Sequence, residues 1–349
     1  MNHKRYIGEI MGGKPVYIGR NAPNEHVILA GVSGSGKSSR SKEMEEQIVK
    51  NGGTVIAIDI NGTHPLVEDS ICNYISAQED GLDVTFLDTS LVELGKETMM
   101  NLVQYVMETI CPRQLRGAVQ LAKVREAIMF AIQNKGQFSC EMEAIACGLK
   151  EQEESAALGA YNHLCPILEG NIFRKSDKKI QIGKINIISL KGLNPKTQKQ
   201  VVEIMLSVLW RKMRTGVGVQ GGFTLVLDEF QNLDLKQGSA LFEMLTEARK
   251  YEVRLILATQ TLTTFKGREL AVINQAATRL FFQQTATDIK RIGEMIEPGH
   301  GDKWVSKIVR LRIGEAIAVG SIETNGRILD QPIVTHSAYI NKGTGLQKL

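Results

Sequence analysis

Short apolar runs recur along the chain and alternate with longer amphipathic segments. Each run has the length of a strand, and most are rich in the β-branched residues that favour strands. Continuous apolar strands that alternate with helices are typical of an α/β protein with a mostly parallel, buried sheet. We therefore predict strands at His26–Ala30, Thr54–Ile60, Asp83–Asp88, Ile185–Leu190, Phe223–Asp228, Arg254–Thr259, Arg279–Gln283 and Glu315–Val319.

Helices are predicted between these strands. Asn194 and Pro195 form an N-cap followed by proline at the first helical position, and the apolar residues at 201–213 recur at helical spacing. A second helix is expected over Ser239–Tyr251, and a third over Arg40–Val49. Each would connect one strand of the sheet to another.

The strand-like runs stop between Val106 and Glu169. Apolar residues recur there at helical spacing, from Leu115 to Ile132 and again from Ala156 to Leu168. This pattern predicts an all-α insertion in the α/β fold. We divide the chain into two parts of one α/β core at 1–105 and 176–340, an all-α insertion at 106–175, and a flexible tail at 341–349.

Composition excludes several classes of protein. With 43% hydrophobic and 23% charged residues, the chain is typical of a soluble globular protein. It has no apolar run of about 18 residues and no apolar stretch behind its basic N-terminus, so we expect neither a membrane span nor a signal peptide. The five cysteines form no CxxC pair, which favours a reducing, cytoplasmic location. A net charge of +4 is compatible with nucleic-acid binding but does not require it.

One segment matches the phosphate-binding pattern GxxxxGK[ST] in full. It follows a predicted strand and precedes a predicted helix, where glycines let backbone N–H groups surround a phosphate at a helix N-terminus. Lys37 would reach the β- and γ-phosphates, and the Ser38 hydroxyl would bind Mg²⁺. The alternative is a glycine-rich turn that matches by chance. The expected nucleotide-binding residues are Gly31, Val32, Ser33, Gly34, Ser35, Gly36, Lys37, Ser38 and Ser39.

Two further buried strands end in polar residues that suit ATP hydrolysis. The run at 223–227 ends in Asp228 and Glu229, at the carboxyl edge of the predicted sheet. Asp228 would hold Mg²⁺ through water, and Glu229 would polarise the attacking water. The alternative for this pair is a solvated turn. Gln260 ends the later strand, where it could sense the γ-phosphate or hold the attacking water.

These motifs, in this order, resemble the HerA/FtsK superfamily of ring-shaped DNA-pumping ATPases. The similarity is greatest to the conjugative coupling proteins (TraG/TraD-like) and related type IV secretion ATPases. It covers most of the chain outside the helical insertion. It rests on Gly31–Ser38, Asp228–Asn232, Glu247–Tyr251 and Leu255–Gln260, with support from Gly13–Ile18, His26, Asp59 and Gly314–Ala316.

The resemblance implies a RecA-like P-loop ATPase core that uses ATP and Mg²⁺. It makes Lys37 and Ser38 nucleotide ligands, Asp228 and Glu229 the Walker B pair, and Gln260 the sensor. Arg249 matches the arginine that reaches into the neighbouring subunit's site, which implies a homo-oligomer, expected to be a hexamer. Arg279 is the alternative arginine finger. The implied partners are DNA and a membrane-anchored secretion or conjugation component or a relaxase.

The chain departs from the family pattern at three places. Glu252 stands where the family has a glycine that ends a helix. After Asp59, Ile60 and Thr63 replace a proline and an acidic residue, which weakens the case for Asp59 as a catalytic residue. Coupling proteins that are anchored in membranes carry transmembrane helices, whereas this chain has none. It is therefore either a minimal version or is docked at the membrane by another subunit.

Basic residues gather at two places that could grip DNA phosphates. Arg113, Arg116 and Lys123 share one face of a predicted helix, and Arg174, Lys175, Lys178, Lys179 and Lys184 crowd a loop. Contacts of this kind would be independent of sequence and sensitive to salt. The alternative for each cluster is ordinary solvated surface.

Two other functions use the same nucleotide chemistry. One is a secretion ATPase that acts on protein. The other is a nucleotide-gated assembly factor with little turnover, against which Glu229 and Arg249 argue because a protein that only binds nucleotide needs neither.

Overall fold

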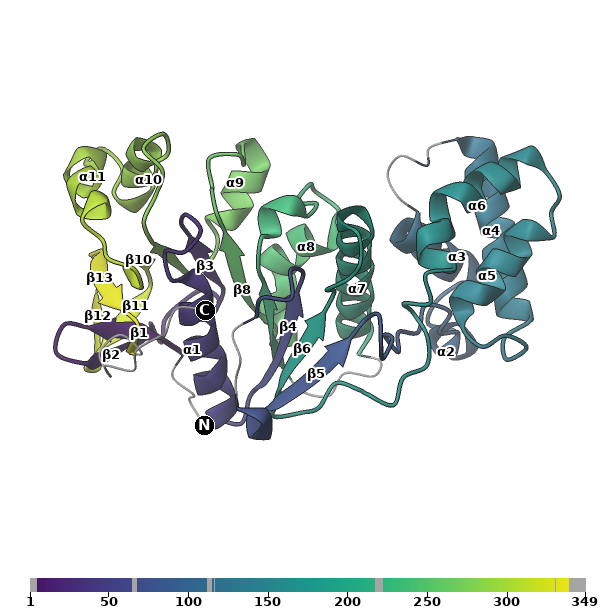
Figure 1. Cartoon of the computed structure of the whole chain (residues 1–349), viewed down its shortest axis with the longest axis horizontal. Helices are drawn as coiled ribbons and strands as arrows, with labels where there is room; N and C mark the ends of the chain where they lie inside the picture. The colour runs from purple at the N-terminus through teal and green to yellow at the C-terminus, as the bar shows by residue number, and fades with distance from the viewer. Residues whose placement is uncertain are drawn as a thin grey trace.

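The computed structural model describes residues 5–64, 68–111, 115, 117–216, 222–329 and 331–338. A single sheet runs through the molecule, with the strand order β12-β11-β2-β1-β13-β10-β9-β3-β8-β7-β4-β6-β5 (Figure 1). Its strands are β1 Tyr6–Ile10, β2 Lys14–Ile18, β3 Val27–Ala30, β4 Thr54–Asp59, β5 Cys72–Ser76, β6 Ile185–Ser189, β7 Phe223–Leu227, β8 Arg254–Thr259, β9 Thr278–Phe281, β10 Glu315–Gly320, β11 Ile322–Thr324, β12 Arg327–Leu329 and β13 Ile333–His336.

The predicted parallel sheet forms one half of this larger sheet. Strands β5, β6, β4, β7, β8, β3 and β9 all pair in parallel, so their carboxyl ends meet at one edge. Such an edge is where α/β proteins place their ligands. The α/β class expected from the sequence is therefore confirmed.

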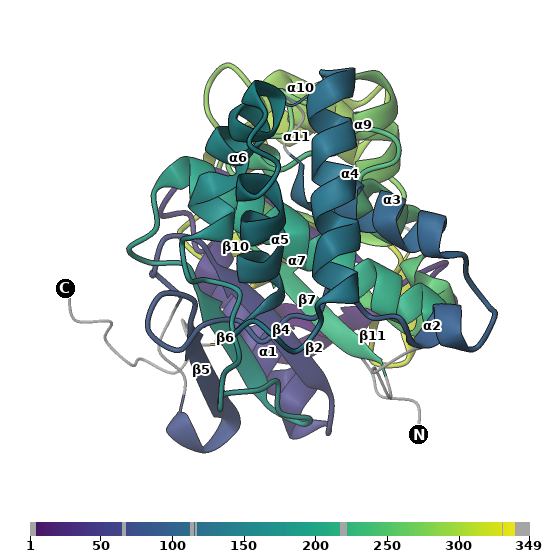
Figure 2. The ribbon, with the colours of Figure 1, turned by 90° about the vertical axis from the view of Figure 1, so that its right-hand side faces the viewer.

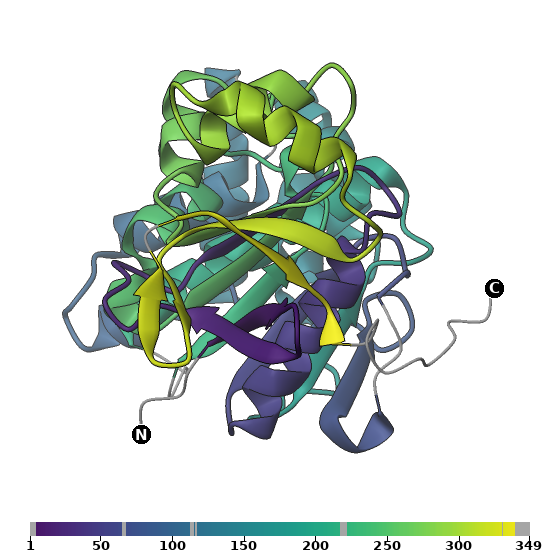
Figure 3. The same cartoon turned by 90° about the vertical axis from the view of Figure 1, so that its left-hand side faces the viewer.

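The other half of the sheet is antiparallel. Strand β10 pairs antiparallel with both β9 and β13, and β1, β2, β11 and β12 continue the antiparallel pattern to the edge. Figure 3 shows how this half brings the early strands β1 and β2 beside the late strands β10–β13. Helices α10 (Ile289–Ile296) and α11 (Gly301–Val309) pack on each other in the connection between β9 and β10.

Alternate residues of the central strands supply two separate cores. Val27 and Leu29 of β3 pack on the side of α1 (Lys37–Lys50), together with Met44 and Ile48. Ile28 and Ala30 point to the opposite face. That face is covered by α7 (Pro195–Thr215), α8 (Ala240–Glu247) and α9 (Gly267–Ile273). The predicted cap of α7 is present, because the Asn194 side chain accepts a hydrogen bond from Thr197 N at 3.0 Å.

The segment without strands forms a group of helices beyond α7 (Figure 2). It consists of α2 Ser90–Glu93, α3 Met99–Ile110, α4 Ala118–Gln133, α5 Glu141–Lys150 and α6 Ser155–Leu168. The group begins before residue 106, because α2 precedes that position and α3 starts at Met99. Both α3 and α6 contact α7, which links the group to the core.

One predicted strand is wrong, and the observed strands β1, β2, β5, β11, β12 and β13 were not among those predicted. Residues 83–88 are not a strand; the N–H groups of Phe86 and Leu87 instead donate to Glu141 Oε2 at the start of α5, at 2.5 and 3.1 Å. The parallel edge position is taken by β5, whose sequence CNYIS has little of the apolar character of a buried strand.

The predicted tail at 341–349 lies outside the described residues. Within the part of the chain that the structure describes, no helix combines the length and the apolar character that crossing a membrane requires.

Candidate nucleotide site

The phosphate-binding motif forms a tight loop between β3 and α1. Gly34 and Gly36 have φ values of 76° and 103°, in the left-handed region that glycine adopts without strain. The loop is held open by hydrogen bonds from Gly31 N to Thr259 O at 3.1 Å and from Val32 N to Gln283 O at 2.9 Å. These bonds connect the loop to the ends of the neighbouring strands.

The Lys37 ammonium lies inside this loop. Its Nζ donates to Gly31 O at 2.7 Å and to Val32 O at 3.1 Å. Burial lowers the pKa of Lys37, while the carboxylates of Asp228 and Glu229 act in the opposite direction and favour its charged form. The lysine is therefore placed between the loop and the two acidic residues.

A second segment closes the loop from the side of β10. Gly314 N donates to Ser35 O at 2.9 Å, and a Cβ atom on Gly36 would come within 2.6 Å of Gly314 Cα. Backbone therefore packs directly on backbone here. Gly36 could therefore not be replaced without moving the loop.

Arg40, one turn after Lys37, fixes α1 to the antiparallel half of the sheet. Its side chain is fully buried. Its Nη1 donates to Ile7 O at 2.7 Å and to Thr335 Oγ1 at 3.1 Å, and its Nη2 donates to Gly314 O at 2.9 Å. One guanidinium thus joins β1, β13 and the segment before β10 to the phosphate loop.

Asp228 and Glu229 leave β7 at the carboxyl edge, next to the phosphate loop. Burial raises the pKa of Asp228, and the negative charge of Glu229 adds to this effect. Lys37 opposes it in part. Asp228 Oδ1 accepts a hydrogen bond from Glu229 N at 2.8 Å, which fixes the turn between the two residues.

Glu229 is held by two amides. Its Oε1 accepts from Gln260 Nε2 at 2.7 Å, and its Oε2 accepts from Gln231 Nε2. Its backbone has a φ of 54°, which is uncommon for a residue with a side chain and marks stored strain. Gln260 was predicted here, but Gln231 was missed. Its position two residues after Glu229, in the motif that supplied Asp228–Asn232, was the available signal.

Asp59 lies near this pair but is used for local structure. Its carboxylate accepts hydrogen bonds from Thr63 N at 3.0 Å and from His64 N at 3.2 Å. The loop after β4 is thereby folded over the strand end. The negative charge of Asp59 also adds to the raised pKa of Asp228.

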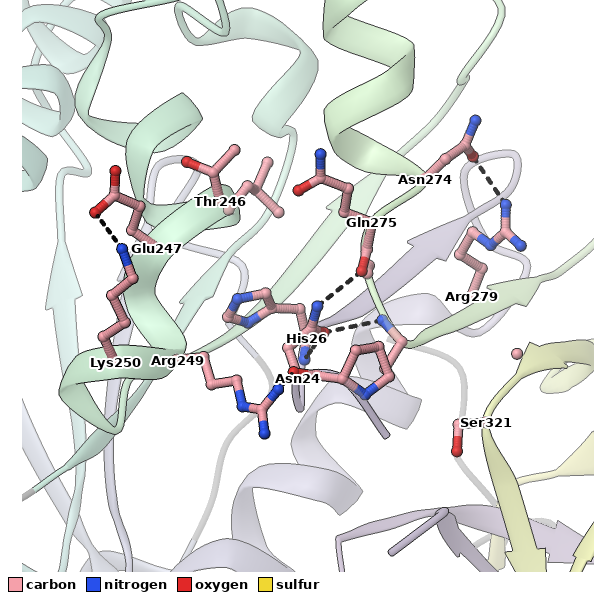
Figure 4. Close-up of a pocket in the computed structure, with 15 residues that line it drawn as sticks. Asn24, His26, Thr246, Glu247, Arg249, Lys250, Asn274, Gln275, Arg279 and Ser321 are labelled. Carbon is pink, nitrogen blue, oxygen red and sulfur yellow. Dashed lines mark hydrogen bonds and ion pairs between the residues drawn. The ribbon is translucent and has the colours of Figure 1, made fainter. Parts of the chain in front are cut away.

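The predicted arginine fingers lie away from the phosphate loop, at the opposite edge of the parallel strands. Arg249 is in the short 3-10 helix Ala248–Tyr251 that precedes β8, and Arg279 is near the start of β9. Both line one cavity of about 890 Å³ (Figure 4). Neither can reach the phosphate loop of its own chain from there, because the length of the parallel strands separates the two edges.

The two arginines differ in how they are held. Arg249 is exposed and donates to Pro23 O, whereas Arg279 donates to Asn274 Oδ1 at 2.8 Å. Burial lowers the pKa of Arg279, and its Nε has no partner among the described residues. Figure 4 shows Arg249 extending toward His26 and Asn24, with Arg279 at the other end of the cavity.

Most of the basic residues predicted to contact DNA form ion pairs or hydrogen bonds with other residues of the same chain. Lys123 pairs with Glu154 at 2.6 Å, and Arg174 Nη2 donates to Glu79 O at 2.6 Å. Lys178 pairs with Asp80 and Lys179 with Asp83, at 3.1 and 3.5 Å. Lys175 is exposed. Arg113 and Arg116 lie outside the described residues.

The geometry fits a nucleoside triphosphate with Mg²⁺. Gly34 has open space where a side chain would stand, and Ser33, Gly34 and Ser38 are exposed at the mouth of the loop. No group of three or more protein ligands for a metal occurs in the described ranges. A magnesium ion bound by Ser38 and Asp228 would therefore need phosphate oxygens as well, as is usual for this ion.

Comparisons with known proteins extend over most of the chain. The family model "Helicase HerA, central domain" matches residues 5–209. The DNA double-strand break repair helicases HerA of Sulfolobus acidocaldarius and Sulfurisphaera tokodaii are each 22% identical to the chain, over 341 and 348 residues. These matches cover 90% of this chain and 66% of each relative. The chain therefore spans slightly under two thirds of the length of these relatives.

Solved structures share the fold. VirB4 of Thermoanaerobacter pseudethanolicus superposes with a TM-score of 0.73 at 14% identity, over 97% of this chain and 96% of that one. The plasmid coupling protein TrwB in complex with ADP and Mg²⁺ superposes with a TM-score of 0.61 at 13% identity, over 91% and 86%. At these identities the likeness is one of fold.

Proposed function

Because the chain belongs to the family of the HerA helicase central domain, we propose that it is an ATPase that moves DNA through a ring of identical subunits. We place this activity in conjugative transfer or type IV secretion, at the cytoplasmic face of a membrane. A membrane-anchored component or a relaxase would dock the ring there. A hexamer is the ring that the family resemblance implies.

One observation carries the proposal of ATP hydrolysis. Lys37, the Asp228–Glu229 pair and Gln260 follow three different strands and meet beside one phosphate loop. Bound ATP would supply the phosphoanhydride bond that is broken. Mg²⁺ would neutralise negative charge on the phosphates. Lys37 would exchange its carbonyl partners for phosphate oxygens, and Ser38 and Asp228 would hold the metal ion. Glu229 would orient and polarise the attacking water, with Gln260 fixing its carboxylate.

The ring is proposed from the position of the arginines. Arg249 lies at the edge of the sheet opposite its own phosphate loop, so its charge can assist hydrolysis only in another subunit. An arginine supplied in this way contributes roughly 10³ to 10⁵-fold in rate. We assign this role to Arg249 because it is exposed, with Arg279 as the alternative.

The steady-state ATPase rate, measured without DNA, with single-stranded DNA and with duplex DNA, tests the proposal. We expect stimulation by DNA that declines as salt is raised from about 50 to 200 mM, because phosphate contacts release counterions. Absence of turnover under all conditions, with ATP still bound, would contradict the ATPase and favour a nucleotide-gated assembly factor.

A protein substrate is the second candidate, and one observation favours it. Four of the described cations that the sequence offered for DNA binding are paired within the chain: Lys123, Arg174, Lys178 and Lys179. ATP hydrolysis that neither form of DNA changes, by a protein shown to be oligomeric, would support this candidate and contradict DNA translocation.

A further inference from the structure

We infer that Ile313 forms the apolar surface on which the nucleobase of the bound nucleotide rests. This inference rests on the proposed function, since it requires that a nucleoside triphosphate occupies the phosphate loop. It adds a base-binding position to a site whose other proposed ligands all contact phosphate or metal.

The order of the strands sets the direction of the nucleotide. Strands β8 and β7 lie on one side of β3, and β9 and β10 lie on the other. Asp228 and Glu229 follow β7, so the terminal phosphate must point to that side to be hydrolysed. The nucleoside end of the same molecule must then leave the loop on the side of β9 and β10.

The segment before β10 meets the phosphate loop on that second side. Gly314 contacts Gly36 through backbone atoms and donates its N–H to Ser35 O at 2.9 Å. On the other side of Ile313, Leu311 O accepts a hydrogen bond from Gln283 Nε2 at 2.7 Å, and Gln283 O in turn accepts from Val32 N. The residues that flank Ile313 are thus fixed to the loop from both directions.

Ile313 is left exposed by this arrangement. Its side chain is 66% exposed, while its neighbours at 311 and 314 are buried. The Arg312 N–H donates to Glu315 Oε2 at 2.8 Å, so the turn that presents Ile313 is itself hydrogen-bonded. A large apolar side chain on a hydrogen-bonded turn beside a phosphate loop offers a base a contact surface with little reordering of the backbone.

Isothermal titration of the full chain with ATP and with inorganic triphosphate, both with Mg²⁺, tests the inference. For Ile313→Ala we expect ATP to bind about five- to tenfold more weakly, because part of the apolar contact with the base is lost. Binding of inorganic triphosphate, which has no base, should change by less than about twofold. Ile313→Leu, which keeps an apolar surface, should bind ATP like the wild type.

Ile328→Ala is the matched control, because it makes the same substitution at an exposed isoleucine of β12, at the far edge of the sheet. It should leave both affinities unchanged. Unchanged ATP binding in Ile313→Ala, or an equal loss for ATP and triphosphate, would overturn the inference. If the wild type bound triphosphate and ATP with equal affinity, the base would contribute nothing to binding. The inference would then fail, although the phosphate site would be confirmed. If it bound neither, the proposed function itself would fail.

Discussion

Glu229 is constrained at its backbone and at its carboxylate. Its left-handed φ of 54° costs energy, and hydrogen bonds from Gln231 and Gln260 occupy its two oxygens. The strain persists because these partners and the bond to Asp228 determine the geometry jointly. A carboxylate positioned in this way before substrate binds needs little reorganisation during the reaction.

Replacement of Glu229 by glutamine should separate binding from hydrolysis. Glu229→Gln keeps the size of the side chain but removes the group that polarises water, so we expect turnover to fall about 10²- to 10⁴-fold with ATP affinity unchanged. Single-turnover hydrolysis and nucleotide titration measure the two effects. Glu79→Gln, an exposed glutamate away from the site, is the control. Turnover at the wild-type rate in Glu229→Gln would remove Glu229 from the mechanism.

His26 is a buried histidine that the fold keeps neutral. Burial lowers its pKa to about 4, and Glu25 opposes this effect. Its Nδ1 accepts a hydrogen bond from Leu255 N at 3.2 Å, which joins the start of β3 to β8. The sequence order placed His26 within the family pattern, and the structure gives it a bridging position between strands.

The free energy of unfolding should therefore fall as the pH is lowered. The unfolded histidine takes up a proton below about pH 6.5, whereas the folded one resists protonation until about pH 4. The contribution of His26 to the free energy of unfolding is fully present above the pKa of the unfolded histidine. It falls by about 3 kcal/mol as the pH is lowered to 4. Urea unfolding of wild type and His26→Gln from pH 7 to 4 measures the difference. His300→Gln, at an exposed histidine, should match the wild type, and an identical decline in His26→Gln would refute the assignment.

The local sequence predicts the phosphate loop but not the residues that hold the loop in position. Gly31–Ser38 form a contiguous motif whose geometry follows from its own glycines, so the loop could be predicted. The contacts of Arg40 and Gly314 join residues from distant parts of the chain, and Arg40 and Thr335 are separated by 295 positions. Nothing in the neighbouring residues of either partner encodes such a contact.

At the scale of elements, Glu252 takes the place of a helix-ending glycine. It follows the 3-10 helix Ala248–Tyr251 with a φ of 56°, the left-handed conformation that glycine adopts freely. The departure that the sequence showed at this position therefore leaves the shape of the helix end unchanged. The backbone strain of a residue with a Cβ atom is the cost.

Glu252→Gly should stabilise the chain by about 0.5–1 kcal/mol, because it relieves this strain more than it loosens the unfolded chain. The midpoint of urea unfolding reports the change. Glu252→Ala removes the same carboxylate but keeps the Cβ atom, so it should give no such gain. Equal stabilisation by both substitutions would mean that charge, not backbone conformation, is the cause.

The strands that were predicted correctly are buried on both faces of the sheet, so their sequences are continuous apolar runs. Residues 54–59, 223–227 and 254–259 are such strands, and all three were predicted. Residues 83–88 have a similar composition but pack against α5, where Glu141 takes their backbone N–H groups. Strand β5 lies at the sheet edge and has a polar, partly exposed sequence, so periodicity could not reveal it.

At the scale of the whole molecule, the proposed function divides the hydrolytic site between two opposite edges of the parallel strands. The phosphate loop and Glu229 are at the carboxyl edge of the parallel strands, and Arg249 is at the amino edge. If Arg249 is the arginine finger that we propose, one copy of the chain cannot complete the site. A ring in which each copy faces the next in the same sense would bring the two halves together.

Mixing two inactive variants tests this arrangement. Subunits with Arg249→Ala keep Glu229, and subunits with Glu229→Gln keep Arg249, so a mixed ring contains complete sites between unlike neighbours. We expect the mixture to recover up to about a quarter of the wild-type ATPase rate, since half of the sites keep Glu229 and half of these face an intact arginine.

Lys37→Ala mixed with Glu229→Gln is the matched control. Lys37 and Glu229 lie in the same half-site, so this mixture should show only the summed rates of its components. A failure of the Arg249→Ala mixture to exceed its own sum would mean that Arg249 does not act across an interface. The same pairing with Arg279→Ala would then test the alternative.

Arg40 ties the completion of the nucleotide site to the order of synthesis. Its buried guanidinium donates hydrogen bonds to Thr335 and to the carbonyl of Gly314. Both residues are synthesised long after the loop at 31–38. At translation rates of about 5–20 residues per second, the delay over 295 residues is roughly 15 to 60 s. During that interval a nascent chain has the phosphate-binding motif but not the brace that holds it.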